Sequence, residues 1–301
     1  RPKKTAVALD LVARGRSVTA VADAIGIRRQ HLSAMHNRPP SRTRGRPPLP
    51  DAELVADIRA LLADLPTYGY RRVHALLRRQ ARQTGRAAPN PKRVYRVMKV
   101  HGLLLQPHSG KGQERRHDGR VSVDRRNTRW CSDALEIGCD NGEKVRVAFA
   151  LDCCDREAMG HVATTGGITA EDVRDLMVAT VEHRFGPVNR LAEPIEWLTD
   201  NGSPYVAGDT RRFARDIGLL PRTTPVSSPQ SNGMAEAFVR TLKRDYVRVN
   251  PTPDARTVIE QLPAWLTHYN EVHPHKALGC QSASKKDPLS ASKRDPVCRA
   301  V

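Results

Sequence analysis

The chain has 301 residues, with 50 Lys and Arg against 32 Asp and Glu, a formal net charge of +18. Residues 1–130 hold 29 of these basic residues and 9 of the acidic ones, so a front half of net charge +20 precedes a back half of −2. This asymmetry indicates a polyanion partner, most simply nucleic acid. No apolar run is long enough to span a membrane and no signal-like start is present, so we expect a cytoplasmic protein with no membrane partner.

Residues 1–36 are predicted to form a helix-turn-helix DNA-binding segment. The stretch SVTAVADAIGIRRQHLSAMH has a small residue at Ala22, a turn glycine at Gly26 and a core aliphatic at Leu32, as this motif requires. A plain amphipathic helix pair is the alternative. In the helix-turn-helix interpretation the recognition helix opens with three residues that would contact DNA: Arg28, Arg29 and Gln30.

Residues 37–50, NRPPSRTRGRPPLP, are predicted to be a basic linker, because Pro and Gly prevent both a helix and a central strand. The group around Arg44 and Arg46 resembles an AT-hook, whose arginines enter a narrow minor groove. An ordinary basic linker is the simpler interpretation, and either version would lie near phosphate.

Residues 51–106 are predicted to form a second helix-turn-helix-like DNA-binding domain of three helices, at 51–64, 70–82 and 90–100. The third helix opens with an Asn90-Pro91 cap. On the basic side of this helix the candidate DNA contacts are Lys92, Arg93 and Arg96. The alternative is that this side is an ordinary charged face exposed to solvent. Residues 107–128 are polar and basic and read as a second linker.

From residue 129 onward the pattern changes to strands and helices. The Asp140-Asn141-Gly142 turn joins the first two strands as a hairpin. Three strands followed by alternating helix and strand predict an α/β domain with a mixed sheet. The expected strands are 128–139, 143–155, 157–165, 194–200 and 219–225, and the expected helices are 169–185, 208–217 and 235–247.

Three acids are candidate catalytic and metal-binding residues. Asp133 lies in the first strand, Asp200 ends the fourth, and Glu236 begins the last helix. Ligands bind at strand ends in open α/β sheets, so the three could meet at one rim. Clustered carboxylates repel one another, and a pair of Mg²⁺ or Mn²⁺ ions would relieve the repulsion. Asp152 also ends a strand, and by position alone it could replace any of the three.

The helix that Glu236 opens is basic. Arg240 and Lys243 follow at helical spacing and share a face with Glu236. The simplest role for Glu236 is an ion pair with Arg240. In the functional alternative, the side chains of Arg240 and Lys243 contact DNA.

The blocks WCSD, WLTDNGSPY and SPQSNGMAEAFVRTLKRDY resemble the DDE integrase core of retroviral integrases and bacterial transposases. Thirty-five residues separate Asp200 from Glu236, and Lys243 stands seven after Glu236, as in transposases of the insertion sequence three family. LPTYGYRRVHALLRR and HYNEVHPHKALG resemble flanking blocks of that family's second-frame product, OrfB. WCSD, FALDCCDREA and TTGG together are most similar to the insertion sequence two branch.

The resemblance implies a ribonuclease H-like core over residues 129–280, before a polar tail at 281–301. It implies two divalent ions, one shared by Asp133 and Asp200 and the other by Asp133 and Glu236. It also implies a transposase that binds terminal inverted repeats and target DNA as a homo-oligomer, with the first-frame product OrfA as a further partner. Lys243 would contact DNA phosphate. A catalytically inactive DNA-binding regulator is the alternative function, and His273 and His275 are not expected to bind zinc, because no Cys-x-x-Cys pair exists.

Overall fold

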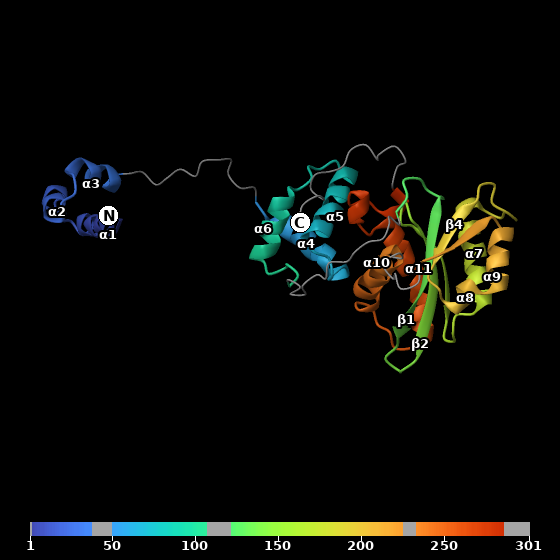
Figure 1. Ribbon diagram of the computed structural model, residues 1–301. Helices are drawn as coiled ribbons and strands as arrows, with labels where there is room; N and C mark the ends of the chain where they lie inside the picture. Colours follow the sequence, from blue (N-terminus) through green and yellow to red (C-terminus); the bar gives the residue numbers. More distant parts are fainter. Residues whose placement is uncertain (1, 38–49, 107–121, 225–232, 286–301) are drawn as a thin grey trace. The chain divides into compact units, whose positions relative to one another are not determined.

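The structure is a computed structural model that describes residues 2–37, 50–106, 122–224 and 233–285. The chain divides into two compact units, Arg1–Pro50 and Asp51–Val301 (Figure 1). The two linker arginines singled out above, Arg44 and Arg46, lie outside the described residues. Within the described ranges, every helix is too short or too polar to cross a membrane.

The first unit contains three short helices, α1 (Pro2–Ala13), α2 (Val18–Ile25) and α3 (Arg29–His36). Ala22 and Leu32 are buried in its core, and Gly26 ends α2 in the left-handed conformation, which glycine adopts without a steric cost. The small residue, the turn glycine and the core aliphatic therefore occupy the places that the sequence predicts.

The second unit begins with a helical module of α4 (Ala52–Asp64), α5 (Tyr70–Gln83) and α6 (Pro91–Val100). The predicted cap at the start of α6 is present, since the Asn90 side chain accepts a hydrogen bond from the backbone amide of Lys92. Apolar residues at helical spacing meet in one small core between the three helices.

A mixed five-stranded sheet follows, in the order β3-β2-β1-β4-β5, which confirms the predicted sheet type. The antiparallel pairs are β1 with β2 and β2 with β3, and the parallel pairs are β1 with β4 and β4 with β5. The strands are β1 (Arg129–Gly138), β2 (Lys144–Asp152), β3 (Ala158–Thr164), β4 (Ile195–Thr199) and β5 (Leu219–Thr223).

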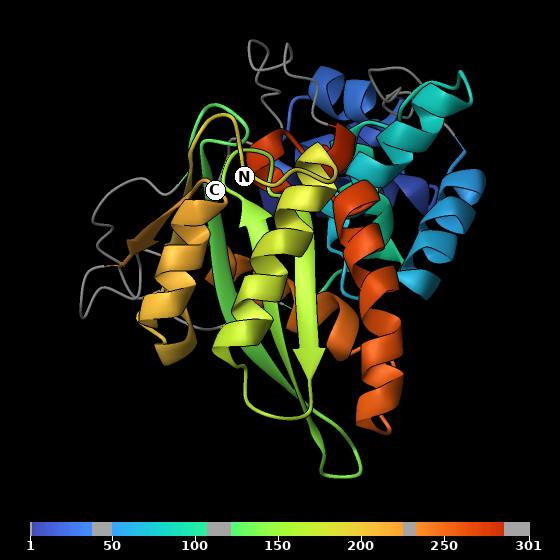
Figure 2. The same cartoon turned by 90° about the vertical axis from the view of Figure 1, so that its right-hand side faces the viewer.

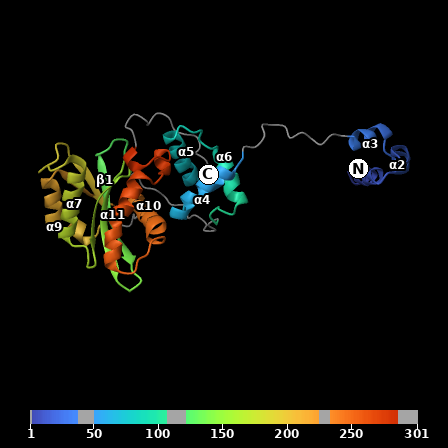
Figure 3. The ribbon, with the colours of Figure 1, turned by 180° about the vertical axis from the view of Figure 1, so that it is seen from behind.

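Helices cover both faces of the sheet. One face carries α7 (Ala170–Phe185), with α8 (Ser203–Val206) and α9 (Gly208–Asp216) beside it; in Figure 2 α7 lies in front of the strands. The other face carries α10 (Gly233–Leu242) and α11 (Ala255–Glu271), which Figure 3 shows between the sheet and the helical module. Short 3-10 turns follow α11 at Lys276–Leu278 and Ala283–Lys285.

Apolar spacing predicts one long helix from 235 to 247, and the structure differs. The α-helix begins at Gly233 and gives way at Lys243 to a π-helical turn, η2 (Lys243–Val247). The wider turn lets two consecutive side chains be buried, Asp245 toward the helical module and Tyr246 toward α11, where its hydroxyl lies 3.0 Å from His268 Nδ1.

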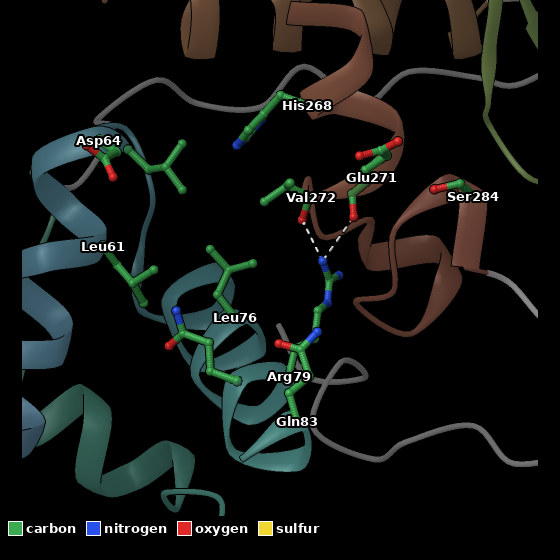
Figure 4. A pocket seen from close by; sticks show the side chains of 11 residues that line it. Leu61, Asp64, Leu76, Arg79, Gln83, His268, Glu271, Val272 and Ser284 are labelled. Carbon is green, nitrogen blue, oxygen red and sulfur yellow. Dashed lines mark hydrogen bonds between the residues drawn. The ribbon is translucent and has the colours of Figure 1, made fainter. Parts of the chain in front are cut away.

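The helical module docks on α11 and η2 through polar contacts. Arg79 of α5 donates to the backbone carbonyls of Glu271 and Val272 at the end of α11, at 3.2 and 3.1 Å (Figure 4). A cation at a helix C-terminus is favourable because the carbonyls there have no partner within the helix. Tyr68 reaches the same region, where its hydroxyl lies 2.9 Å from His273 Nδ1.

Candidate functional site

Strand register brings Asp133 and Asp200 to neighbouring positions. The parallel pairing of β1 with β4 includes Cys131 opposite Leu198. Asp133 and Asp200 each stand two residues further along, so they continue the same register and face the same side of the sheet. Cys131 and Leu198 belong to the core under α10 and α11, and the two acids therefore lie on the α10 side.

The third acid reaches this place through packing of α10. Phe238, two residues after Glu236, packs against Phe149 with ring centroids 4.5 Å apart. Phe149 is the residue of β2 that pairs with Asp133. The first turn of α10, which carries Glu236, is therefore held over the strand that carries Asp133.

The charges of Asp200 and Glu236 both act on the carboxyl group of Asp133. Burial raises the pKa of Asp133 to about 6, and the negative charges of Asp200 and Glu236 add to the rise. The backbone amide of Ala134, 2.8 Å from Asp133 Oδ1, opposes it. Three acids from three separate elements thus form one repelling group.

The turn after β4 gives Asp200 a defined orientation. Its Oδ1 accepts a hydrogen bond from the Gly202 amide at 3.0 Å. A Cβ on Gly202 would lie 3.0 Å from that same oxygen, so the close approach favours glycine. The neighbouring Asn201 donates from Nδ2 to the Thr224 carbonyl at 3.1 Å, which ties this turn to the end of β5.

Tyr205 is a neighbour of the acids that the sequence analysis does not single out. Ser132, next to Asp133, donates to the Tyr205 hydroxyl at 3.2 Å. Burial raises the pKa of Tyr205, and the charges of Asp133 and Asp200 raise it further. The Ser-Pro-Tyr that follows Asn201-Gly202 was the signal that could have pointed to it.

The donor set suits a hard divalent cation, since it consists of carboxylate oxygens whose mutual repulsion such an ion would relieve. Over the ranges that the structure describes, no three His, Cys, Asp or Glu side chains stand close enough together to hold a metal ion as they lie. The structure therefore shows that the charges of Asp200 and Glu236 act on Asp133. The role of the three acids as metal ligands stays a prediction.

The contacts of the competing acid, Asp152, indicate a structural role. It is fully buried and accepts hydrogen bonds from the amides of Cys154 and Asn127, at 2.6 and 2.8 Å. Trp130 Nε1 and Arg184 Nη2 approach it at 3.3 and 3.4 Å. With its oxygens engaged in the protein interior, Asp152 holds the start of β1 and the turn after β2.

The candidate DNA-contacting residues fall into two groups. Six exposed residues lie at the start of α3, at the start of α6 and along α10 and η2: Arg28, Arg29, Gln30, Lys92, Arg240 and Lys243. The other two, Arg93 and Arg96, donate to Asp51 beside α4 at 2.9 and 2.7 Å. Those two arginines therefore also hold α6 against the start of α4.

Comparison with known proteins adds family information. Residues 123–229 and 218–282 match integrase core domain models, and residues 49–111 match an HTH-like domain model. These matches, with the sheet order above, confirm the expected ribonuclease H-like integrase core behind a helix-turn-helix-like module. The structure of the HTLV-2 integrase catalytic core in complex with magnesium has 12% identity and a TM-score of 0.40, over 53% of this chain and 95% of that one.

Two curated relatives are much more similar in sequence. The transposase InsD for insertion element IS2-9 of Escherichia coli (strain K12) is 49% identical over 93% of this chain and 92% of its own length. The transposase InsD for insertion element IS2A/D/F/H/I/K of Escherichia coli is 50% identical over 90% of this chain and 91% of its own length. The chain therefore belongs to the family of IS2 transposases, within the insertion sequence three family, and is a DDE polynucleotidyl transferase that works on DNA.

Proposed function

We propose that this transposase binds the terminal inverted repeats of its insertion sequence, and that Asp133, Asp200 and Glu236 are the residues that cut and join the DNA strands. The observation that carries the proposal is the convergence of the three acids: strand register places Asp200 beside Asp133, and the contact of Phe238 with Phe149 holds the start of α10 over Asp133. Such a group of acids, drawn from β1, the end of β4 and the start of α10, is costly to keep unless it serves chemistry.

In this proposal the acids hold two Mg²⁺ or Mn²⁺ ions. Asp133 and Asp200 would bind one ion, and Asp133 and Glu236 the other. When bound, the ion pair would supply charge stabilisation for the attacked phosphodiester and for the attacking and leaving oxygens. The Gly202 amide keeps Asp200 oriented toward this task, and the packing of Phe238 on Phe149 holds α10 in place.

The reaction is two displacements at phosphorus. In the first, a water oxygen bonds to the phosphorus at the end of the element, the bond to the 3′ oxygen breaks, and a 3′-hydroxyl is released. In the second, that hydroxyl bonds to the phosphorus of another phosphodiester, whose own 3′ oxygen leaves. Arg240 and Lys243, exposed on the helix that Glu236 opens, would hold the DNA phosphates beside the reacting one.

DNA recognition is assigned to the basic front half of the chain. We propose residues 1–36 and 51–106 as the two DNA-binding domains, 37–50 and 107–128 as basic linkers, 129–280 as the catalytic core and 281–301 as a polar tail. Arg28, Arg29 and Gln30 would contact bases or phosphates, and Lys92 would contact phosphate. Action as a homo-oligomer, cooperation with the first-frame product OrfA and a cytoplasmic location belong to the same proposal.

The test uses the full chain with labelled DNA that carries the element's terminal repeat. Asp200→Asn and Glu236→Gln should lose strand cleavage and joining while repeat binding persists, whereas Asp216→Asn, an exposed acid of α9, should keep both activities. Normal joining by Asp200→Asn would show that the assignment is wrong. A wild-type chain that binds but never cuts would instead be an inactive regulator. Hydrolysis without joining, indifferent to the repeat, would indicate a nuclease.

A further inference from the structure

A cavity of about 620 Å³ lies between α10, α5 and the segment that follows α11. Ala237 and Thr241 contribute to its α10 wall, while Glu236, on another side of the helix, is not among the lining residues. The cavity belongs to the second unit, and it is distinct from the three acids described above. Its size is within the range of pockets that bind small organic groups.

The rim of this cavity is cationic. Among the described residues that line it, none is Asp or Glu and four are basic: Arg71, Arg72, Arg156 and Lys276. Arg72 is paired with Asp245. The side chains of Arg156 and Lys276 have no hydrogen bond or ion pair with any residue that the structure describes, so their charges are available to a ligand. Arg156 also has a φ of +66°, a backbone conformation that a non-glycine residue rarely adopts and that is found preferentially at functional sites.

The floor of the cavity is made of largely buried aromatic rings that pack edge to face. Tyr269 contacts the rings of Phe238 and His275, each with centroids 4.8 Å apart, and His273 lies 4.9 Å from His275. Burial lowers the pKa of His275 to about 4 and lowers that of His273 further, so both rings are neutral at physiological pH. The positive charge of the cavity therefore comes from its arginines and lysine, and the floor is a neutral aromatic surface.

Cations beside aromatic rings are the combination that proteins use for nucleotides outside a duplex, with phosphate on the cations and the base against the rings. A duplex presents phosphates outward and keeps its bases stacked inside, so a base must leave the stack to reach such a floor. We propose that this cavity binds one unpaired nucleotide of the DNA on which the transposase acts, with its phosphate between Arg156 and Lys276. The inference rests on the proposed function. Because α10 forms one wall, the bound nucleotide would hold the strand against the helix that carries Glu236.

Two variants test the inference in the full chain. Arg156→Gln combined with Lys276→Gln removes both available charges while it keeps long polar side chains. Ala277→Trp fills the cavity from its exposed edge without a change of charge. The matched control is Arg212→Gln combined with Arg215→Gln, two exposed arginines of α9 on the opposite face of the sheet.

The measurement is the affinity for two fluorescent probes, a fully paired duplex and the same duplex with a short unpaired extension at one end. Wild type should prefer the extended duplex. The charge variant should bind it on the order of tenfold more weakly, as expected when a hydrogen bond to a charged group is lost. The slope of log affinity against log salt should fall by roughly 0.7 for each single-strand phosphate contact removed. Ala277→Trp should also lose the preference, and the control should keep it.

The outcomes separate the inference from the proposed function. If both cavity variants keep the wild-type preference and salt slope, the cavity does not bind a nucleotide. Equal binding of the two probes by wild type would also reject the inference, while DNA binding and strand joining remain to support the proposed function. A wild-type chain that binds neither probe would count against the proposed function itself.

Discussion

Arg72 of the helical module and Asp245 of η2 form an ion pair, with Nη1 2.8 Å from Oδ2 and the Asp245 side chain only 1% exposed. Thr67 donates to the same carboxylate at 2.7 Å, and Arg244 contacts both of its oxygens at 2.7 Å. Burial favours the neutral form of Asp245, but these hydrogen bonds and charges outweigh it and hold the pKa of Asp245 below its ordinary value. The π-helical turn after α10 is thereby joined to the helical module by a fully satisfied buried carboxylate.

Asp245→Ala should destabilise the protein by about 2 kcal/mol, because the partly exposed Arg72 and Arg244 and the Thr67 hydroxyl lose the carboxylate that accepts their hydrogen bonds. The midpoint of urea unfolding, followed by far-ultraviolet circular dichroism, measures the loss. Asp57→Ala changes an exposed acid of α4 and should leave the midpoint nearly unchanged. Equal midpoints for the two variants would mean that the Asp245 contacts do not stabilise the docked helical module.

The buried neutral His275 predicts a loss of stability in acid. Its pKa is about 4 in the folded chain against an ordinary 6.5, because burial disfavours its charged form. The unfolded chain therefore takes up a proton first, and stability that is present above pH 6.5 should decline by about 3 kcal/mol as the pH falls to 4.

His275→Gln should reduce this decline, and the buried His273, whose pKa is also lowered, should keep part of it; a series of urea midpoints between pH 7 and pH 4 measures the difference. The comparison is His101→Gln, at the exposed end of α6, which should follow the wild-type curve. A wild-type slope that survives in His275→Gln would assign the acid sensitivity to other groups.

Repulsion among the three acids predicts opposite effects of Asp200→Asn with and without metal. Without metal, the variant should melt at or above the wild-type temperature, because one repelling charge beside Asp133 is gone. With Mg²⁺ at 100 times its dissociation constant, wild type should gain about 2.7 kcal/mol, and the variant much less. Differential scanning fluorimetry in EDTA and in a MgCl₂ series gives both numbers. An unchanged magnesium response in the variant would remove Asp200 from the proposed ligands.

Lys243→Gln should weaken DNA binding through phosphate alone. As an exposed ammonium at the first position of η2, Lys243 acts as a point charge, so its loss should reduce the salt slope of binding by about 1 for every DNA sequence tested. Arg215→Gln is the single-charge control. A loss of affinity confined to one sequence would point instead to base recognition.

Local patterns were enough to predict most of the elements. The helices of the helical module and the five strands occur within a few residues of their predicted bounds, because apolar periodicity, the Asn90 cap and the turn at Asn141-Gly142 depend on neighbouring residues. The helix Ala255–Glu271 was not named, and Pro263 inside it is a residue that normally argues against a helix. The π-helical turn at Lys243 also escaped prediction, since contacts with distant segments maintain it.

The sequence by itself determined which acids were candidates, because strand ends and a helix start can be recognised locally, but it ranked Asp152 as highly as Asp133. Only the tertiary structure distinguished them. It buries Asp152 among amide donors, and it places Asp133 where Asp200 and Glu236 act on its pKa. The same is true of the cavity at Arg156 and Lys276, whose charge and ring floor come from segments far apart in the chain. Burial and convergence depend on the path of the whole chain, and no local pattern contains that information.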